Sequence, residues 1–141
     1  MHWLNRKSHL YVKALAKKGQ GLFCGVDINK NDVIEKAPAI FFNKSEAVHI
    51  DKTGLYDYYF SLSYLSDDQA NHIGIKPDEK GCSGAVIFGA GSIANHSDRP
   101  NAGITFEVLD GRLYAGLKAL VHIPAEQEIC ISYGELWFEP A

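Results

Sequence analysis

The chain lacks the features that define membrane-spanning and zinc-binding proteins. No apolar run in its 141 residues approaches the roughly 20 residues needed to cross a bilayer. The three cysteines, Cys24, Cys82 and Cys130, are odd in number, far apart and form no C-x-x-C pair, which argues against a cysteine zinc site. Cys24 and Cys130 each lie in an apolar run, where a buried free thiol is the usual state. We therefore expect buried free thiols, no bound metal and no membrane contact.

The chain also lacks a strong charge of either sign. Its 14 Lys and Arg against 17 Asp and Glu give a net charge of −3, and Lys17–Lys18 is a pair rather than a basic patch. Because nucleic-acid phosphates require clustered basic side chains, direct nucleic-acid binding is not expected. An acidic surface would suit a basic, lysine-rich partner instead. The N-terminus has no apolar stretch after its first charges, so we expect an intracellular protein, cytoplasmic or, in a eukaryotic host, nuclear.

Short apolar runs separated by turn residues predict a mainly β fold with short helices, in one domain that spans residues 1–141. The predicted strands are Leu10–Val12, Gly21–Ile28, Val33–Ala37, Ala39–Phe42, Ala85–Phe88, Ile104–Val108, Leu113–Leu117 and Ile129–Tyr133. Asp110-Gly111 between two of these runs predicts a two-residue hairpin, because both turn positions need a positive φ. One short helix is predicted to begin near Ser45, with Ser45 as its N-cap and Glu46 in its first turn. The segment Ser61–Gly84 is predicted to be a loop with one helical turn.

Two segments of the chain echo each other. Val26–Ile34 and Val121–Ile129 both contain V-x-I, then five polar turn positions, then an isoleucine that opens a new strand. Two such strand-turn-strand corners favour a compact β fold with pseudo-symmetric sheets, although a chance match would give the same pattern.

Two polar segments near the chain ends each have two interpretations. In Gly19–Phe23, glycines two apart would let backbone groups approach a ligand, or would simply form a turn. This G-x-G does not complete a dinucleotide-binding fingerprint, and no helical pattern follows it. Near the other end, Tyr133 precedes Gly134 and is either a core aromatic with its hydroxyl at the surface or a hydroxyl held at a reaction centre.

The third polar segment, Gly89–Gly103, has an unusual density of hydrogen-bonding side chains. A metal site would need several ligands within reach, and only His96 and Asp98 lie close together. Ser97 does not sit in a nucleophile elbow. From the residues alone, this segment is either a ligand-binding loop or a loop that is held by its own hydrogen bonds.

In order and spacing, the three segments resemble the SET domain of protein-lysine methyltransferases that depend on S-adenosyl-L-methionine (AdoMet). The family patterns G-x-G-[VLI]-[FY], N-H-S-x-x-P-N and G-E-E-[LI]-x-x-x-Y correspond to Gly19–Phe23, Asn95–Asn101 and Glu126–Tyr133. The resemblance covers residues 12–134 and leaves a short tail, residues 135–141. It implies a β-clip-like fold with several small sheets and a C-terminal pseudoknot, in which the Asn95–Asn101 segment is threaded beneath the loop that carries the last strand. The chain is similar to the short stand-alone SET domains of bacteria and viruses.

The resemblance implies a reaction and a set of site residues. Methyl groups would pass from AdoMet to lysine side chains of a protein or peptide, giving S-adenosyl-L-homocysteine, without a metal. The implied cofactor contacts are Lys18, Gly19, Gln20, Gly21, Leu22, Phe23, Tyr58, Asn95, His96, Tyr133 and Trp137. The implied catalytic residues are Tyr133 and Tyr58, and the implied walls of the lysine channel are Tyr58, Tyr59, Ile131 and Tyr133. Asn95 would contact the methionine part of the cofactor and the His96 backbone its adenine, while Asn101 would lock the loop.

The chemistry requires a neutral lysine amine aligned with the methyl group. A free lysine has a pKa near 10.4, and both desolvation and the positive sulfur of the cofactor would lower it. Tyr133 would orient the amine rather than act as a strong base. The residues that depart from the family pattern include Asp98 where cysteine is commonest, Ser132 where Asp usually precedes the tyrosine, and Glu126 in place of the usual glycine. Ile131, at the position that tunes the number of methyl groups in relatives, would permit di- or trimethylation.

Several alternatives stay open at this level. The chain could be a non-catalytic relative that binds AdoMet or a basic partner, or a β-rich structural domain whose polar loop only packs. The tail around Trp137 could close over the adenine or pack as ordinary apolar surface. A homodimer is a further expectation, because a minimal domain lacks the flanking modules that usually complete the peptide groove.

Overall fold

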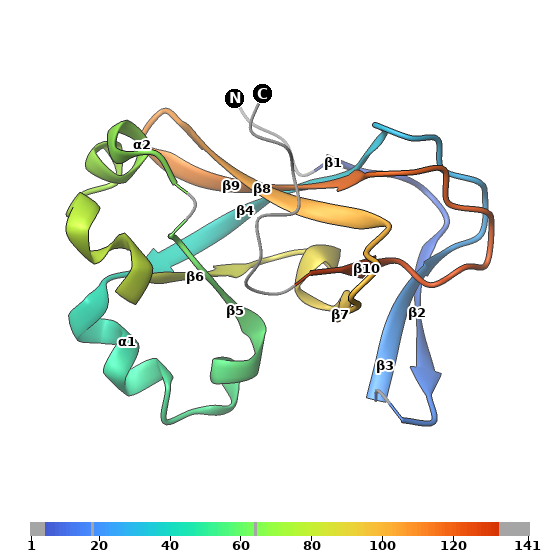
Figure 1. The fold of residues 1–141 in the computed structure, drawn as a ribbon, viewed down its shortest axis with the longest axis horizontal. Coiled ribbons are helices and arrows are strands. Elements are labelled where there is room, and N and C mark those ends of the chain that lie inside the picture. The colour runs from blue at the N-terminus through green and yellow to red at the C-terminus, as the bar shows by residue number, and fades with distance from the viewer. Residues whose placement is uncertain (1–4, 18, 64, 133–141) are drawn as a thin grey trace.

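Strands dominate the computed structural model, which describes residues 5–17, 19–63 and 65–132 (Figure 1). The strands are β1 (Asn5–Arg6), β2 (Leu10–Leu15), β3 (Gly19–Cys24), β4 (Val33–Phe42), β5 (Tyr59–Ser61), β6 (Gly84–Ile87), β7 (Asn95–His96), β8 (Ala102–Leu109), β9 (Arg112–Ala119) and β10 (Cys130–Ile131). The helices are α1 (Lys44–Ile50) and α2 (Asp67–His72), with the 3₁₀ helices η1 (Gly54–Tyr58), η2 (Pro77–Cys82) and η3 (Ala90–Ser92). Within the described residues, no helix is long and apolar enough to span a membrane. The mainly β fold with short helices is thus confirmed.

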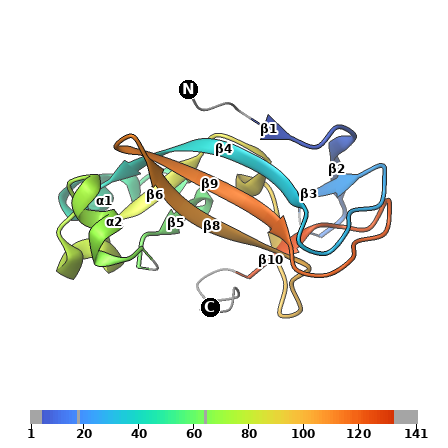
Figure 2. The same ribbon diagram turned by 90° about the horizontal axis from the view of Figure 1, so that it is seen from above.

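The largest sheet has the strand order β5-β6-β4-β9-β8, and β1 pairs with β4. Figure 2 shows this sheet curving between two ends, with α1 and α2 at one end and the β2–β3 hairpin at the other. Its strand β4 runs unbroken through Pro38, so the prediction of two separate strands, Val33–Ala37 and Ala39–Phe42, is wrong. Proline lacks an N–H, but the Pro38 carbonyl still accepts a hydrogen bond of 3.0 Å from the Phe88 N–H, which keeps the strand in the sheet.

The β8–β9 hairpin forms where the Asp110-Gly111 pair predicted it. Leu109 pairs with Arg112, and the two turn residues have φ values of 52° and 72°. These angles are the ones a two-residue turn requires between right-twisted strands. The same register continues to Ala102 and Ala119, so the last two residues of the polar Gly89–Gly103 segment already belong to β8.

The N-terminus of α1 differs from the prediction. The N-cap is Asn43 rather than Ser45: the Asn43 side chain accepts from the Glu46 N–H at 3.0 Å, and the Glu46 carboxylate accepts from the Asn43 N–H at 3.0 Å. Ser45 lies inside the first turn and donates its hydroxyl to Asn43 Oδ1 at 2.8 Å. Asn43 is the N-cap because Glu46 lies three residues after it and completes the capping box, which Ser45 could not form with Glu46. Asparagine and serine are about equally good N-cap residues, so the position of Glu46 decides between them.

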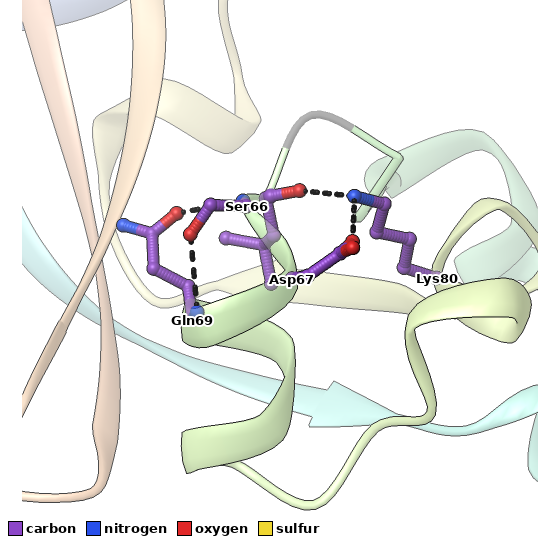
Figure 3. Close-up of polar contacts among 5 residues, drawn as sticks. Ser66, Asp67, Gln69 and Lys80 are labelled. Carbon is purple, nitrogen blue, oxygen red and sulfur yellow. Dashed lines mark hydrogen bonds and ion pairs between the residues drawn. The ribbon is translucent and has the colours of Figure 1, made fainter.

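The segment predicted to be a loop, Ser61–Gly84, contains α2 and η2. A second capping box begins α2, with Ser66 and Gln69 bonded to each other's backbone N–H groups (Figure 3). Lys80 on η2 closes the segment by donating to the Leu65 carbonyl at 2.7 Å and to Asp67 Oδ1 at 2.9 Å. These helices cover a small apolar cluster formed by Leu62, Leu65, Ala70, Ile73, Ile75, Ala85 and Leu113. The prediction of a loop is therefore wrong, because that cluster stabilises helices whose own sequences are too polar and short to form alone.

The main core lies between the large sheet and the strands that carry the three motifs. Its members are Leu22, Cys24, Ile28, Ile34, Ala37, Ile87, Ala94, Ala102, Ile104, Ala115, Leu117, Ala119, Ile123, Ile129 and Ile131. Cys24 and Cys130 are buried free thiols, as predicted, and Cys82 is an exposed free thiol. Burial of the isoleucines at 123, 129 and 131 anchors the last motif to the rest of the fold.

The two echoing corners of the sequence lie against each other. Ile28 and Ile123 exchange backbone hydrogen bonds of 2.9 and 2.8 Å, and both side chains are buried. Each corner also has a left-handed residue at the same place in the pattern, Asn31 with φ 73° and Glu126 with φ 70°. The repeated sequence pattern therefore encodes a repeated backbone turn.

Candidate functional site

The Asn95–Asn101 segment and the last motif are held side by side. Strand β7 pairs in parallel with β10, so that Asn95 lies opposite Cys130 and His96 opposite Ile131. The Ser97 N–H continues the pairing by donating to the Ile131 carbonyl at 2.8 Å. In Figure 1 the two short strands lie between the large sheet and the β2–β3 hairpin. Residues more than 30 apart in sequence thereby form one two-stranded parallel ladder.

The side chain of Asn101 holds the segment that leads into β10 by hydrogen bonds to its backbone. Its Nδ2 donates to the Glu128 carbonyl at 2.8 Å, and its Oδ1 accepts from the Cys130 N–H at 2.8 Å. The Asn101 backbone N–H donates to the Cys130 carbonyl at 3.2 Å, and its carbonyl accepts from Leu120 at 2.8 Å. One asparagine therefore mimics a strand, satisfying backbone groups on the neighbouring segment from its side chain. This geometry agrees with the locking role that the resemblance implied.

Asn95 joins all three motifs at one point. Its Nδ2 donates to the Gln20 carbonyl of the G-x-G segment at 2.8 Å and to Glu128 Oε2 of the last motif at 2.8 Å. Gly21 lies against the same carboxylate, since a Cβ built on it would be 2.8 Å from Glu128 Oε2. Gly19 has φ +77°, and a Cβ built on it would meet nothing within 4 Å. The Gln20 carbonyl, the Asn95 carboxamide and the Glu128 carboxylate, named here the Asn95 cluster, thus form a polar group rich in hydrogen-bond acceptors beside an open glycine.

The neighbours of this cluster differ in exposure. Leu22 and Phe23 are buried, and Phe23 stacks on Tyr11 with ring centroids 5.6 Å apart. The Tyr11 hydroxyl in turn donates to Glu126 Oε2, which ties the β2–β3 hairpin to the first residue of the last motif. The side chain of His96 is 41% exposed, with Nε2 3.2 Å from Asp98 Oδ1. The bond to Glu126 joins the pairing of Leu22 with Ile129 in holding the β2–β3 hairpin against the last motif.

The predicted channel residues occupy three different environments. Tyr58 is 52% exposed at the end of η1, and Ile131 has no exposed surface because it packs in the main core. Tyr59 packs edge-on against Phe42, with centroids 4.9 Å apart, and its hydroxyl donates to Asp51 Oδ1 at 2.7 Å. That hydrogen bond, together with partial burial, raises the pKa of Tyr59 to about 12. The channel roles of these residues stay predictions.

Three predicted site residues, Lys18, Tyr133 and Trp137, lie outside the described residues. Among the described residues, no group of three or more His, Cys, Asp and Glu side chains could hold a metal ion. The structure therefore brings together the predicted cofactor residues Gln20, Gly21 and Asn95, and places Tyr58 and Tyr59 on and after η1.

A buried carboxylate that no sequence motif marked supports the loop before Asn95. Glu35 on β4 is buried, with Oε2 3.0 Å from Arg6 Nε, and its Oε1 accepts from the Gly91 N–H at 3.4 Å. A Cβ on Gly89 would collide with Oε1 and would lie 2.8 Å from Ala37 Cβ. An acidic residue in an otherwise apolar strand, together with a second G-x-G in Gly89-Ala-Gly91, is the signal that could have found it. Glu35 thus holds Gly91, in the middle of η3, against β4.

Comparison with known proteins agrees with this geometry. The SET domain family model matches residues 19–134. A Schizosaccharomyces pombe protein described as a histone-lysine N-methyltransferase, H3 lysine-37 specific, is 28% identical over 134 residues, which are 94% of this chain and 79% of that protein. A candidate histone methyltransferase of Plasmodium falciparum has a similar structure, with a TM-score of 0.65, 24% identity, and 94% of this chain and 99% of that chain covered. The Neurospora SET domain protein DIM-5, a histone lysine methyltransferase, has a TM-score of 0.67, 19% identity, and 94% and 54% coverage. The chain belongs to the SET domain family.

Proposed function

We propose that this chain transfers methyl groups from AdoMet to lysine side chains of a basic protein segment and releases S-adenosyl-L-homocysteine. Membership of the SET domain family and the methyltransferase relative support protein-lysine methyltransferase activity. The observation that carries the proposal is the Asn95 cluster, in which the G-x-G segment, Asn95 and the last motif meet within hydrogen-bond distance.

The residues of the cluster fit the chemistry of AdoMet. The amino-acid part of this cofactor carries an ammonium group, whose hydrogens need acceptors, and the cluster offers a backbone carbonyl, a carboxamide oxygen and a carboxylate. Gly19 leaves the adjoining backbone open, because a Cβ there would meet nothing within 4 Å. We propose that Gly19–Gly21, Asn95 and His96 hold the cofactor. When bound, AdoMet supplies a methyl group on a positively charged sulfur.

The protein's own task is to deliver a neutral, aligned lysine amine. Apolar walls remove water from the amine and lower its pKa, because burial disfavours the charged form. Alignment of the nitrogen with the methyl carbon replaces a random encounter by an oriented one, which lowers the barrier by several kcal/mol, on the order of those seen in intramolecular reactions. We propose Tyr133 as the residue whose hydroxyl orients the amine, with Tyr58 as part of the wall.

The charge distribution supports a basic substrate. Residues 43–84 contain seven acidic and four basic side chains, a balance of −3, whereas the remaining residues contain ten of each. The net negative charge of the chain therefore comes from the segment that carries α1, η1, α2 and η2. Such a surface raises the encounter rate with a lysine-rich segment of the kind found in histone tails. An intracellular location and a homodimer form part of the same proposal.

The decisive experiment is transfer of tritiated methyl groups from AdoMet to a panel of basic proteins, with label detected on lysine. Tyr133→Phe should reduce the transfer at least tenfold, about 1.4 kcal/mol of transition-state stabilisation. Tyr56→Phe is the matched control, because Tyr56 is an exposed tyrosine of η1, and it should transfer at the wild-type rate. Absence of transfer by wild type with intact AdoMet binding would favour a binding module, and absence of both would refute the proposal.

A further inference from the structure

The carboxamide of Asn95 is held in one orientation by two acceptors. Its Nδ2 lies 2.8 Å from the Gln20 carbonyl oxygen and 2.8 Å from Glu128 Oε2. A backbone carbonyl and an ionised carboxylate can only accept hydrogen bonds, so both must face the NH₂ group rather than the oxygen. The flip of the carboxamide is therefore determined by its partners. Because oxygen and nitrogen lie on opposite sides of the carboxamide carbon, Oδ1 points away from both.

We propose that Glu128 is a positioning residue that fixes Asn95 Oδ1 toward the cofactor's α-ammonium group. The inference rests on the proposed function, since it requires AdoMet to bind beside Asn95. Oδ1 is an acceptor and needs a donor, and the α-ammonium is the donor that the methionine part of AdoMet carries. Without Glu128 the carboxamide can rotate or flip, and a flipped Asn95 would present NH₂ to an ammonium group.

The backbone around Glu128 explains why it can perform this role. The Glu128 carbonyl is held by Asn101 Nδ2 at 2.8 Å, and the next N–H, of Ile129, donates to the Leu22 carbonyl at 2.8 Å. The peptide group that follows Glu128 is thus held at both its carbonyl and its N–H. Ile129 is fully buried, so the segment cannot shift without disturbing the core.

Gly21 is the second part of the arrangement. A Cβ at this position would lie 2.8 Å from Glu128 Oε2 and 2.7 Å from Leu15 Cδ1. Both atoms lie at the far ends of flexible side chains, so the fold should tolerate Gly21→Ala. The added methyl group should push the Glu128 carboxylate away from Asn95. The second glycine of the G-x-G segment thus admits the Glu128 carboxylate in addition to any contact with a ligand.

Two ligands separate this role from a merely structural one. AdoMet carries the α-ammonium group, whereas 5′-methylthioadenosine has the adenosine and the sulfur but no amino-acid part. We would titrate both ligands by calorimetry into the wild type, Glu128→Met, Glu128→Gln and Gly21→Ala, and record the melting temperature of each protein. Glu128→Met removes the acceptor at similar size, and Glu128→Gln retains an oxygen acceptor and is the rescue variant.

The expected result is selective. Glu128→Met should weaken AdoMet binding about tenfold, the loss of one charge-assisted hydrogen bond, with methylthioadenosine affinity within about twofold of the wild type. Gly21→Ala should weaken AdoMet binding as well, because its methyl group displaces the Glu128 carboxylate. Glu128→Gln should remain close to wild type for both ligands. In the free protein, the side-chain NH₂ hydrogens of Asn95 should exchange faster with solvent in Glu128→Met than in the wild type.

Each contrary outcome has a distinct meaning. If Glu128→Met weakens both ligands equally, or weakens neither, Glu128 does not position Asn95 and the inference is overturned. If the wild type binds methylthioadenosine and AdoMet equally well, Asn95 Oδ1 does not contact the ammonium group, and the inference again fails. If the wild type binds neither ligand, the proposed function itself fails.

Discussion

Replacing Asn101 tests whether one side chain holds the two halves of the site together. Asn101→Ala removes two hydrogen bonds of 2.8 Å, one to the Glu128 carbonyl and one from the Cys130 N–H. Each bond contributes about 1 kcal/mol net, and backbone groups left unsatisfied in a partly buried place add a further penalty, so we expect a loss of about 2–4 kcal/mol. Domains of this size have only about 5–15 kcal/mol of stability in total.

The assay is thermal and urea unfolding followed by circular dichroism. At about 3–5 °C per kcal/mol, the melting temperature of Asn101→Ala should fall by roughly 10 °C. Asn101→Asp keeps the acceptor for Cys130 but places a carboxylate oxygen against the Glu128 carbonyl, so it too should be destabilised although its size is unchanged. Asn71→Ala, at an exposed position of α2, is the control and should stay within about 0.5 kcal/mol of wild type. A melting temperature for Asn101→Ala within about 2 °C of wild type would refute the reasoning.

Two other perturbations test the surroundings of the site. Gly89→Ala would drive a methyl group into the buried Glu35 carboxylate and should lower the free energy of unfolding by about 1–3 kcal/mol. Gly81→Ala is the control, because a Cβ there meets nothing within 4 Å, and its stability should be near that of the wild type. Equal urea midpoints for the two variants would contradict this. The hydrogen bond to Asp51 raises the pKa of Tyr59 from 10.0 to about 12, so its contribution to stability is present below pH 10 and is lost between pH 10 and 12. Unfolding midpoints in that range should fall more steeply for wild type than for Tyr59→Phe, and identical slopes would show that the bond does not form in solution.

Local signals predicted local structure well where one residue pair decides the geometry. Asp110-Gly111 predicted its hairpin because few residues other than Asn, Asp and Gly adopt a positive φ cheaply at both turn positions. The same approach failed at Pro38, where the strand continues because its neighbours pair on both sides. It also failed for α2, whose capping box at Ser66 and Gln69 is visible in the sequence but whose stability comes from apolar contacts made far along the chain.

The assembly of the site could not be derived from the residues alone. Nothing in the composition or periodicity of Asn95-His96 says that it pairs in parallel with Cys130-Ile131, because the register of a two-residue strand is set by the buried neighbours on either side. The resemblance to the SET domain predicted that the three motifs form one site. The hydrogen-bond partners of Asn95, the Gln20 carbonyl and the Glu128 carboxylate, are known only from the structure.

The two corners explain one departure from the family pattern in physical terms. Glu126 stands where the family pattern has glycine, and its φ of 70° lies in the left-handed region, which costs a residue with a Cβ about 1–2 kcal/mol. Asn31, at the equivalent place in the other corner, has φ 73°, a conformation that asparagine adopts more cheaply than glutamate does. The Glu126 carboxylate accepts the hydroxyl of Tyr11, a charge-assisted bond that offsets the backbone cost. Glycine would relieve the turn but remove this side-chain bond, so the glutamate exchanges local strain for a tether on β2, the partner of the strand that carries Gln20 and Gly21.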